Sequence, residues 1–152
     1  MKIDFYFSYR SPYSYLILPR VLDLKNNYKI DINFKLVYPL AIREPEFFKG
    51  KNFLTYFFYK IRDMRSVAKQ LDMPFYTPRP DPIKQSYLTG KIADDQPYIF
   101  DLCHIGQQAA QEGLGIEVAY ELSSLIFGTK GGWNEESTLD KAFAKVGLNY
   151  SS

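Results

Sequence analysis

The chain has 152 residues, which is enough for one domain that buries roughly 68 to 70% of its unfolded surface. An apolar fraction of 46% and an aromatic fraction of 17% exclude a disordered chain. Nineteen basic and 17 acidic residues give a net charge of +2 without a long run of either sign, so neither a nucleic acid nor a membrane surface is expected as a partner.

The single cysteine and the N-terminal residues indicate in which compartment the protein is expected. The single cysteine, Cys103, has no partner for an internal disulfide. Charges at Lys2, Asp4 and Arg10 interrupt any apolar core that a signal segment would need, and no apolar stretch approaches the ~20 residues of a membrane-spanning helix. The sequence therefore predicts a soluble, cytoplasmic protein.

The first elements predicted from the sequence form a strand–helix–strand unit. Residues 2–9 alternate between apolar and polar side chains, as strands do, and apolar residues recur at helical spacing from Ser11 until residues 26–27. Alternation returns over residues 29–40. Two strands joined by one helix make a right-handed βαβ unit, so the two strands should be parallel.

After Pro39 the pattern becomes helical. Proline-rich residues 73–82 form a loop, and no element is predicted over residues 83–91. The expected domains are therefore residues 1–40, the βαβ part, and residues 41–152, a helical part. The predicted helices span residues 43–50, 52–72, 97–112, 116–127 and 135–146, the last with Asn134 as N-cap and Gly147 at its end.

The turn between the first strand and the first helix carries the most chemical information. Ser11 followed by Pro12 is a favoured helix start, because serine accepts a bond from a free N–H group and proline fits the first helical position. Yet the carboxyl end of a parallel strand, facing a helix N-terminus, is also where α/β folds bind anions. The turn therefore has both a capping and a ligand-binding interpretation.

The segment DFYFSYRSPYSYL, residues 4–16, strongly resembles the opening of the 2-hydroxychromene-2-carboxylate isomerases and the kappa-class glutathione transferases. Similar features recur at Asp63, Ala68 and residues 72–74. The resemblance implies an α/β fold with a thioredoxin-like βαβ start and an inserted helical domain. Disulfide oxidoreductases of that group carry Cys-Pro-x-Cys at this turn, so Ser11 to Ser14 look like that motif with both sulfurs replaced by oxygen.

The resemblance also implies roles for individual residues. Ser11 is expected to be the catalytic residue, which hydrogen-bonds the sulfur of bound glutathione and stabilises its thiolate. Arg10, Tyr13 and Asn52 are expected to bind glutathione or substrate, although Asn52 is equally suited to cap a helix and an exposed arginine is more often only solvated. The reaction implied is the cis–trans isomerisation of a conjugated or aromatic small electrophile, with glutathione as the cofactor.

The sequence also departs from the family. The isomerases often read Asp-x-x-Arg-Trp-Ala in the long helix, whereas this chain lacks that Arg and Trp between Asp63 and Ala68, so the substrate is not defined. Family members continue past the last helix with two more strands and a closing helix. The resemblance therefore implies a missing C-terminal β-β-α unit, and a homodimer or a strand-completing partner that covers the sheet edge.

Several alternatives stay open at this stage. The resemblance equally allows a kappa-class glutathione transferase, and the incomplete sheet allows a non-catalytic binding module. A Ser-His-Asp hydrolase would have to use His104, the only histidine, and lacks a supporting motif. Cys103 is interpreted as a small core residue, and one cysteine with one histidine is too few ligands to predict a metal site.

Overall fold

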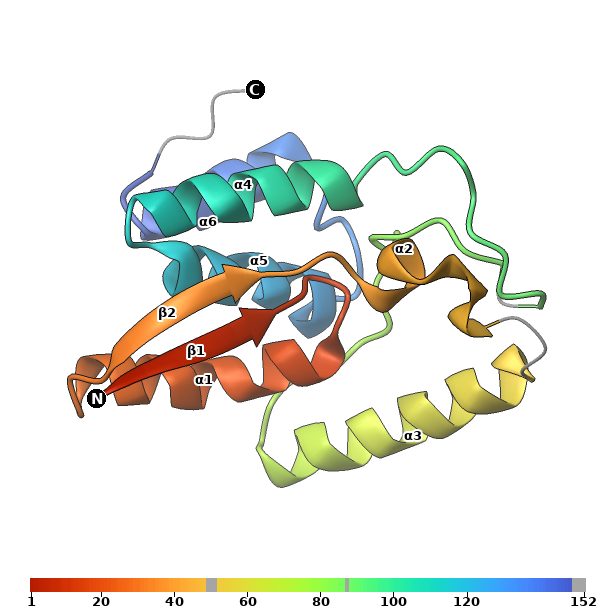
Figure 1. Ribbon diagram of the computed structural model, residues 1–152, viewed down its shortest axis with the longest axis horizontal. Helices are drawn as coiled ribbons and strands as arrows, with labels where there is room; N and C mark the ends of the chain where they lie inside the picture. The colour runs from red at the N-terminus through yellow and green to blue at the C-terminus, as the bar shows by residue number, and fades with distance from the viewer. Residues whose placement is uncertain (49–51, 87, 149–152) are drawn as a thin grey trace.

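The computed structural model of the protein describes residues 1–48, 52–86 and 88–148 (Figure 1). No helix in these ranges is both long enough and apolar enough to cross a membrane. The strands are β1 (Lys2–Phe7) and β2 (Asp31–Leu36). The helical segments are α1 (Pro12–Asn26), α2 (Leu40–Arg43), the 3-10 helix η1 (Pro45–Phe48), α3 (Phe53–Gln70), α4 (Ile99–Gln111), α5 (Gly115–Gly128) and α6 (Glu136–Lys145).

The predicted βαβ unit is confirmed. β1 and β2 pair in parallel with Phe5 opposite Phe34, and α1 connects them. The alternation predicted in the first strand holds: Phe7 and Tyr9 are fully buried, while Tyr6 on the other face is 60% exposed. β1 ends two residues earlier than predicted, because the chain turns at Ser8, whose carbonyl accepts the Ser11 N–H at 3.0 Å.

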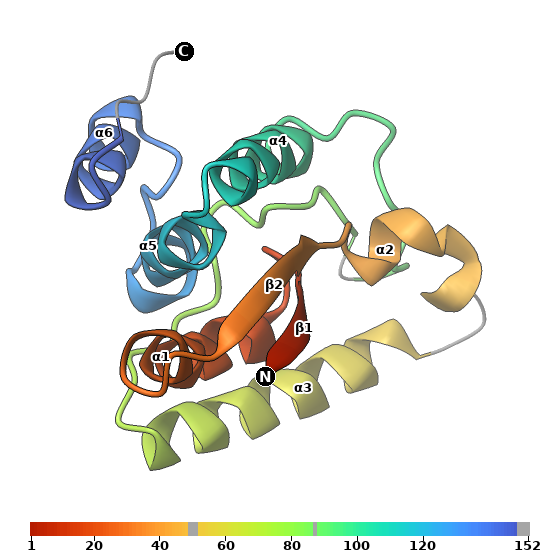
Figure 2. The ribbon, with the colours of Figure 1, turned by 60° about the vertical axis from the view of Figure 1, so that its left-hand side comes forward.

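The helices pack on both sides of α1. In both views α3 lies on one side of α1 and α5 on the other, and α4 and α6 both lie beyond α5 (Figures 1 and 2). α5 approaches the sheet closely at Gly115, where an added Cβ would lie 2.8 Å from the Phe34 ring. α4 approaches the turn that follows β1 at Gly106, where a Cβ would lie 2.6 Å from the Tyr9 hydroxyl.

One hydrophobic core joins the two segments predicted as separate domains. Phe7 and Leu16 from residues 1–40 belong to the same buried cluster as Leu102 and Phe127 from residues 41–152. The division into two domains stays a prediction, but the two segments share their buried surface. Other members of the cluster are Tyr9, Leu18, Val21, Ile99, Ile116, Ala119, Leu122, Ile126, Leu139 and Phe143.

Most of the predicted helices are present with small differences at their ends. The short helix predicted over residues 43–50 is instead α2 followed by η1, since Pro45 interrupts the helical hydrogen bonding, and residues 49–50 lie outside the described residues. The predicted N-cap Asn134 is wrong by one residue, because a turn from Gly132 holds Glu135 in the capping position. Gly147 ends α6 as predicted, with φ 77°.

Candidate functional site

Ser11 caps α1, as its capping interpretation predicts. Its backbone is extended (φ −93°, ψ 108°), Pro12 follows at the first helical position, and Ser11 Oγ accepts a hydrogen bond from the Ser14 N–H at 3.2 Å. Capping occupies an acceptor lone pair of the hydroxyl and leaves its proton available to a ligand. The same group can therefore cap the helix and donate.

A cavity of about 400 Å³ opens beside this turn. Its walls come from the end of β1, the first turn of α1, residues 37–43, α3 and the loop of residues 75–81. A volume of this size is typical of small-molecule sites. The cavity brings together three of the four predicted site residues, namely Arg10, Ser11 and Tyr13.

Arg10 is held by a carboxylate of the protein itself. Its Nε and Nη2 atoms donate to the two oxygens of Asp81 at 3.0 and 3.1 Å, and both side chains are less than one-fifth exposed. Asp81 also accepts the Ile83 N–H at 2.9 Å. Arg10 therefore ties the loop of residues 75–81 to the turn, and its expected contact with glutathione stays a prediction.

Tyr13 connects the turn to α3. Its hydroxyl donates to the Asp63 carboxylate across the cavity wall. Partial burial, and next the contact with Asp63, raise the pKa of Tyr13 to about 12, so the phenol stays protonated at neutral pH. Asp63, noted in the sequence as part of a family-like pattern, thus has a structural function in fixing Tyr13.

Asn52 does not lie with the other predicted site residues. Its Oδ1 atom accepts the Thr55 N–H at 3.1 Å, which is the helix-capping alternative predicted from the sequence. It is exposed and is not among the residues that line the cavity. Its preceding residues, Gly50 and Lys51, lie outside the described residues, and a ligand-binding role for Asn52 stays a prediction.

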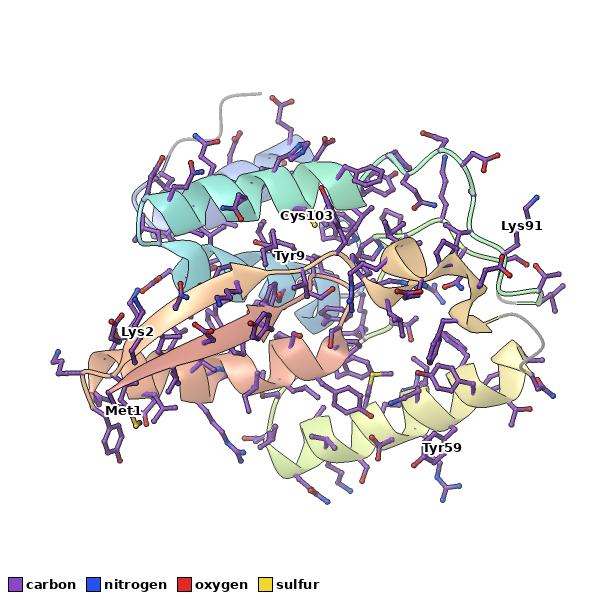
Figure 3. The ribbon with its side chains drawn as sticks, in the orientation of Figure 1. Met1, Lys2, Tyr9, Tyr59, Lys91 and Cys103 are labelled. Carbon is purple, nitrogen blue, oxygen red and sulfur yellow. The ribbon has the colours of Figure 1, made fainter. Side chains whose placement is uncertain are left out.

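The remaining walls of the cavity are largely aromatic. Phe127 at the end of α5 stacks on Phe75 at a centroid distance of 6.2 Å, and both line the cavity. Of the ring-bearing residues of α3, Tyr56 and Phe57 line it as well, whereas Tyr59 is 66% exposed and points away from it (Figure 3). The cavity therefore suits a flat, apolar or aromatic ligand.

Ser8, Lys60 and Arg43 are further polar residues at the cavity. Ser8 Oγ is buried and has no hydrogen-bond partner among the described residues. Lys60 and Arg43 add positive charge to the walls. The alternation of the first strand predicts that Ser8 lies on the face away from the core. The position of Ser8 at the carboxyl end of that strand could have indicated that it lies at a ligand site. Tertiary packing, which brings α3 and α2 to the turn, places the other two at the cavity.

The sequence matches the profile of the DSBA-like thioredoxin domain over residues 2–152. The chain belongs to this family. A solved structure of a 2-hydroxychromene-2-carboxylate isomerase superposes with a TM-score of 0.69 at 18% sequence identity, covering 98% of this chain and 67% of the isomerase chain. No curated protein matches the sequence. The family resemblance and the thioredoxin-like α/β fold predicted from the sequence are thereby confirmed, and the isomerase likeness is one of fold.

The turn at the start of α1 in this DSBA-like domain carries hydroxyls, at Ser11 and Ser14, and no thiol. Cys103 is only 5% exposed and lies in the interior near Tyr9 (Figure 3), and burial raises the pKa of its thiol to about 12. It is a core residue, as predicted. His104 is exposed on α4 and does not line the cavity, so the structure does not bring it together with Ser11.

Proposed function

We propose that this DSBA-like domain is a glutathione-dependent cis–trans isomerase that acts on a conjugated or aromatic small molecule. The observation that carries the proposal is the position of Ser11: its hydroxyl lies on the cavity wall at the N-terminus of α1, with a lone pair engaged by Ser14 and its proton available. The fold likeness to a 2-hydroxychromene-2-carboxylate isomerase supports the choice of reaction.

The residues at the cavity fit glutathione. The unpartnered Ser8 Oγ and the Ser11 hydroxyl supply donors beside the positive end of α1, which suits an anionic sulfur. Arg43 and Lys60 supply positive charge for the carboxylates of a tripeptide. When bound, glutathione would supply a thiolate that adds to a conjugated double bond and leaves after the bond has rotated.

The protein's own residues have distinct parts in this proposal. Ser11 hydrogen-bonds the sulfur and, with the N-terminus of α1, favours its anionic form. Tyr13, kept protonated and fixed by Asp63, forms part of the wall next to the sulfur site. The rings of Phe75 and Phe127 pack against the apolar part of the electrophile and exclude water.

The pKa of the bound glutathione thiol tests the proposal. A free cysteine thiol has a pKa of about 8.5, and the wild-type protein should lower that of glutathione by one unit or more. Ser11→Ala should raise the bound pKa by about one unit, since a hydrogen bond to a charged group contributes about 1.5 to 3 kcal/mol. Ultraviolet absorbance of the thiolate during a pH titration measures it.

A second variant and a control separate this role from capping. Ser11→Asp keeps an acceptor for the Ser14 N–H but has no proton to donate, so it should preserve the helix and still raise the thiol pKa. Ser66→Ala, on the exposed surface of α3, should not change the thiol pKa.

Equal thiol pKa values in wild type and Ser11→Ala would refute the role of Ser11. Stable adduct formation without isomerisation would favour a kappa-class transferase, and no glutathione binding would favour a non-catalytic module.

The expected partners belong to the same proposal. A homodimer or a strand-completing partner would pair with the open edges of the two-stranded sheet formed by the described residues. A cytoplasmic location would supply reduced glutathione. Both stay predictions.

A further inference from the structure

The charged residues at the cavity are unbalanced in favour of positive charge. Among the described residues, three basic side chains line it, Arg10, Arg43 and Lys60, against one carboxylate, Asp81. Asp81 is already paired with Arg10 through two hydrogen bonds. Arg43 Nε donates to the Tyr38 carbonyl at 2.9 Å, but in the described ranges neither Arg43 nor Lys60 is paired with a carboxylate, so both charges can serve a ligand.

Lys60 is held in an unusual environment for a lysine. Its Nζ atom lies 5.0 Å from the centroid of the Tyr13 ring and 5.7 Å from that of Tyr56, and the residue is partly buried. Within the described part of the chain, no carboxylate pairs with it. The two ring faces attract the ammonium group and keep it on the cavity wall instead of in bulk water.

From this arrangement we infer that Lys60 is a specificity-determining residue that selects ligands carrying a carboxylate. The ammonium group, positioned by the rings of Tyr13 and Tyr56, would form a charge-assisted hydrogen bond with that group while the ligand's apolar part packs on Phe75 and Phe127. The inference rests on the proposed function in taking this cavity as the substrate site. The carboxylate belongs either to the electrophile or to glutathione. Either carboxylate would form the same charge-assisted hydrogen bond with Lys60.

Two pairs of probes distinguish these sources. 2-Naphthoate and 2-naphthamide share an aromatic body and differ in charge, and glutathione differs from its glycine ethyl ester in the same way. Calorimetry on wild type, Lys60→Met and Lys69→Met gives the affinity ratio within each pair. Methionine keeps an aliphatic stem of similar shape, and Lys69 is an exposed lysine of the same helix that does not line the cavity.

We expect wild type and Lys69→Met to prefer the charged member of one pair by about tenfold, and Lys60→Met to lose that preference. Loss with the naphthyl pair assigns the carboxylate to the electrophile, and loss with the glutathione pair assigns it to glutathione. Lys60→Glu should reverse the preference, and added salt should reduce it in wild type.

The inference is overturned if Lys60→Met keeps the wild-type ratios, if it weakens both members of each pair equally, or if wild type shows no preference. These results are separable from a failure of the proposed function. A naphthoate preference that depends on Lys60 would persist without glutathione binding, whereas a Ser11-dependent thiol pKa would persist without any role for Lys60.

Discussion

At the scale of single residues, the proposed role of Ser11 would let one side chain serve both folding and chemistry. Its oxygen accepts the Ser14 N–H and thereby satisfies a free donor at the start of α1. Its proton can donate to a ligand at the N-terminus of α1, where the helix dipole favours an anion. A cysteine at this position would bring a reactive sulfur, while serine brings a donor that does not ionise at physiological pH. The replacement suits the binding of a thiolate from another molecule.

A prediction at the same scale concerns the buried thiol of Cys103 and the stability of the protein at alkaline pH. Burial raises the pKa of its thiol from 9.0 to about 12. Below pH 9 the thiol is protonated in both the folded and the unfolded protein and has no effect. Between these values only the unfolded chain loses the proton, so the free energy of unfolding should fall as pH rises, by about 1 to 3 kcal/mol near pH 11.

Denaturant titrations from about pH 8 to pH 11 measure this slope, and Cys103→Ala is the comparison. Buried tyrosines such as Tyr15, whose pKa burial raises to about 12, contribute to the slope in both proteins. The variant should therefore show a shallower loss of stability and not a flat profile. Parallel slopes would contradict the assignment of Cys103 as a thiol that is neutral when folded.

At the scale of elements, the site depends on how the turn and the loop of residues 75–81 are joined. Arg10 and Asp81 form a mostly buried, two-point ion pair between them. Arg10→Met would leave the carboxylate without its partner and should lower the free energy of unfolding by about 2 to 3 kcal/mol. Chemical denaturation measures the change.

A double-mutant cycle with Asp81→Asn isolates the pair. We expect a coupling energy above about 1 kcal/mol, because both side chains are shielded from water. The exposed pair Lys2 and Asp31, with 67% and 68% of the side chains accessible, is the control, and Lys2→Met should cost less than about 0.5 kcal/mol. Additive effects of Arg10→Met and Asp81→Asn would show that the loop is held by other contacts.

At the scale of the whole molecule, the shared core predicts a single unfolding transition. β1 contributes Phe7, and α5 contributes Phe127, to one buried cluster. Native-state hydrogen exchange should therefore give amides of β1 and α5 the same free energy of global opening. Denaturation followed by the fluorescence of Trp133, the only tryptophan, should coincide with loss of far-ultraviolet circular dichroism.

Separate transitions would support the division of the chain into residues 1–40 and 41–152 as independent domains. Titration with glutathione should raise the midpoint of the single transition, because a ligand that binds only the folded state stabilises it. If glutathione raised the free energy of amide opening in α5 but not in β1, the result would contradict the shared core.

The sequence by itself determined most of the elements and the residue types at the turn. Alternation in residues 2–9 defined the first strand, Ser11 and Pro12 defined the start of α1, and Gly147 defined the end of α6, because these signals depend on local backbone geometry and spacing. The segment of residues 4–16 was sufficient to indicate the thioredoxin-like family.

Only the tertiary structure decided which side chains meet at the site. Arg10 pairs with Asp81, 71 residues away, and Tyr13 meets Asp63, 50 residues away. Lys60 reaches the cavity because α3 packs beside α1. The same packing, and not local sequence, separated Asn52 from the cavity. Contacts between distant segments depend on how helices and loops fill the space around the sheet, and no local pattern encodes them.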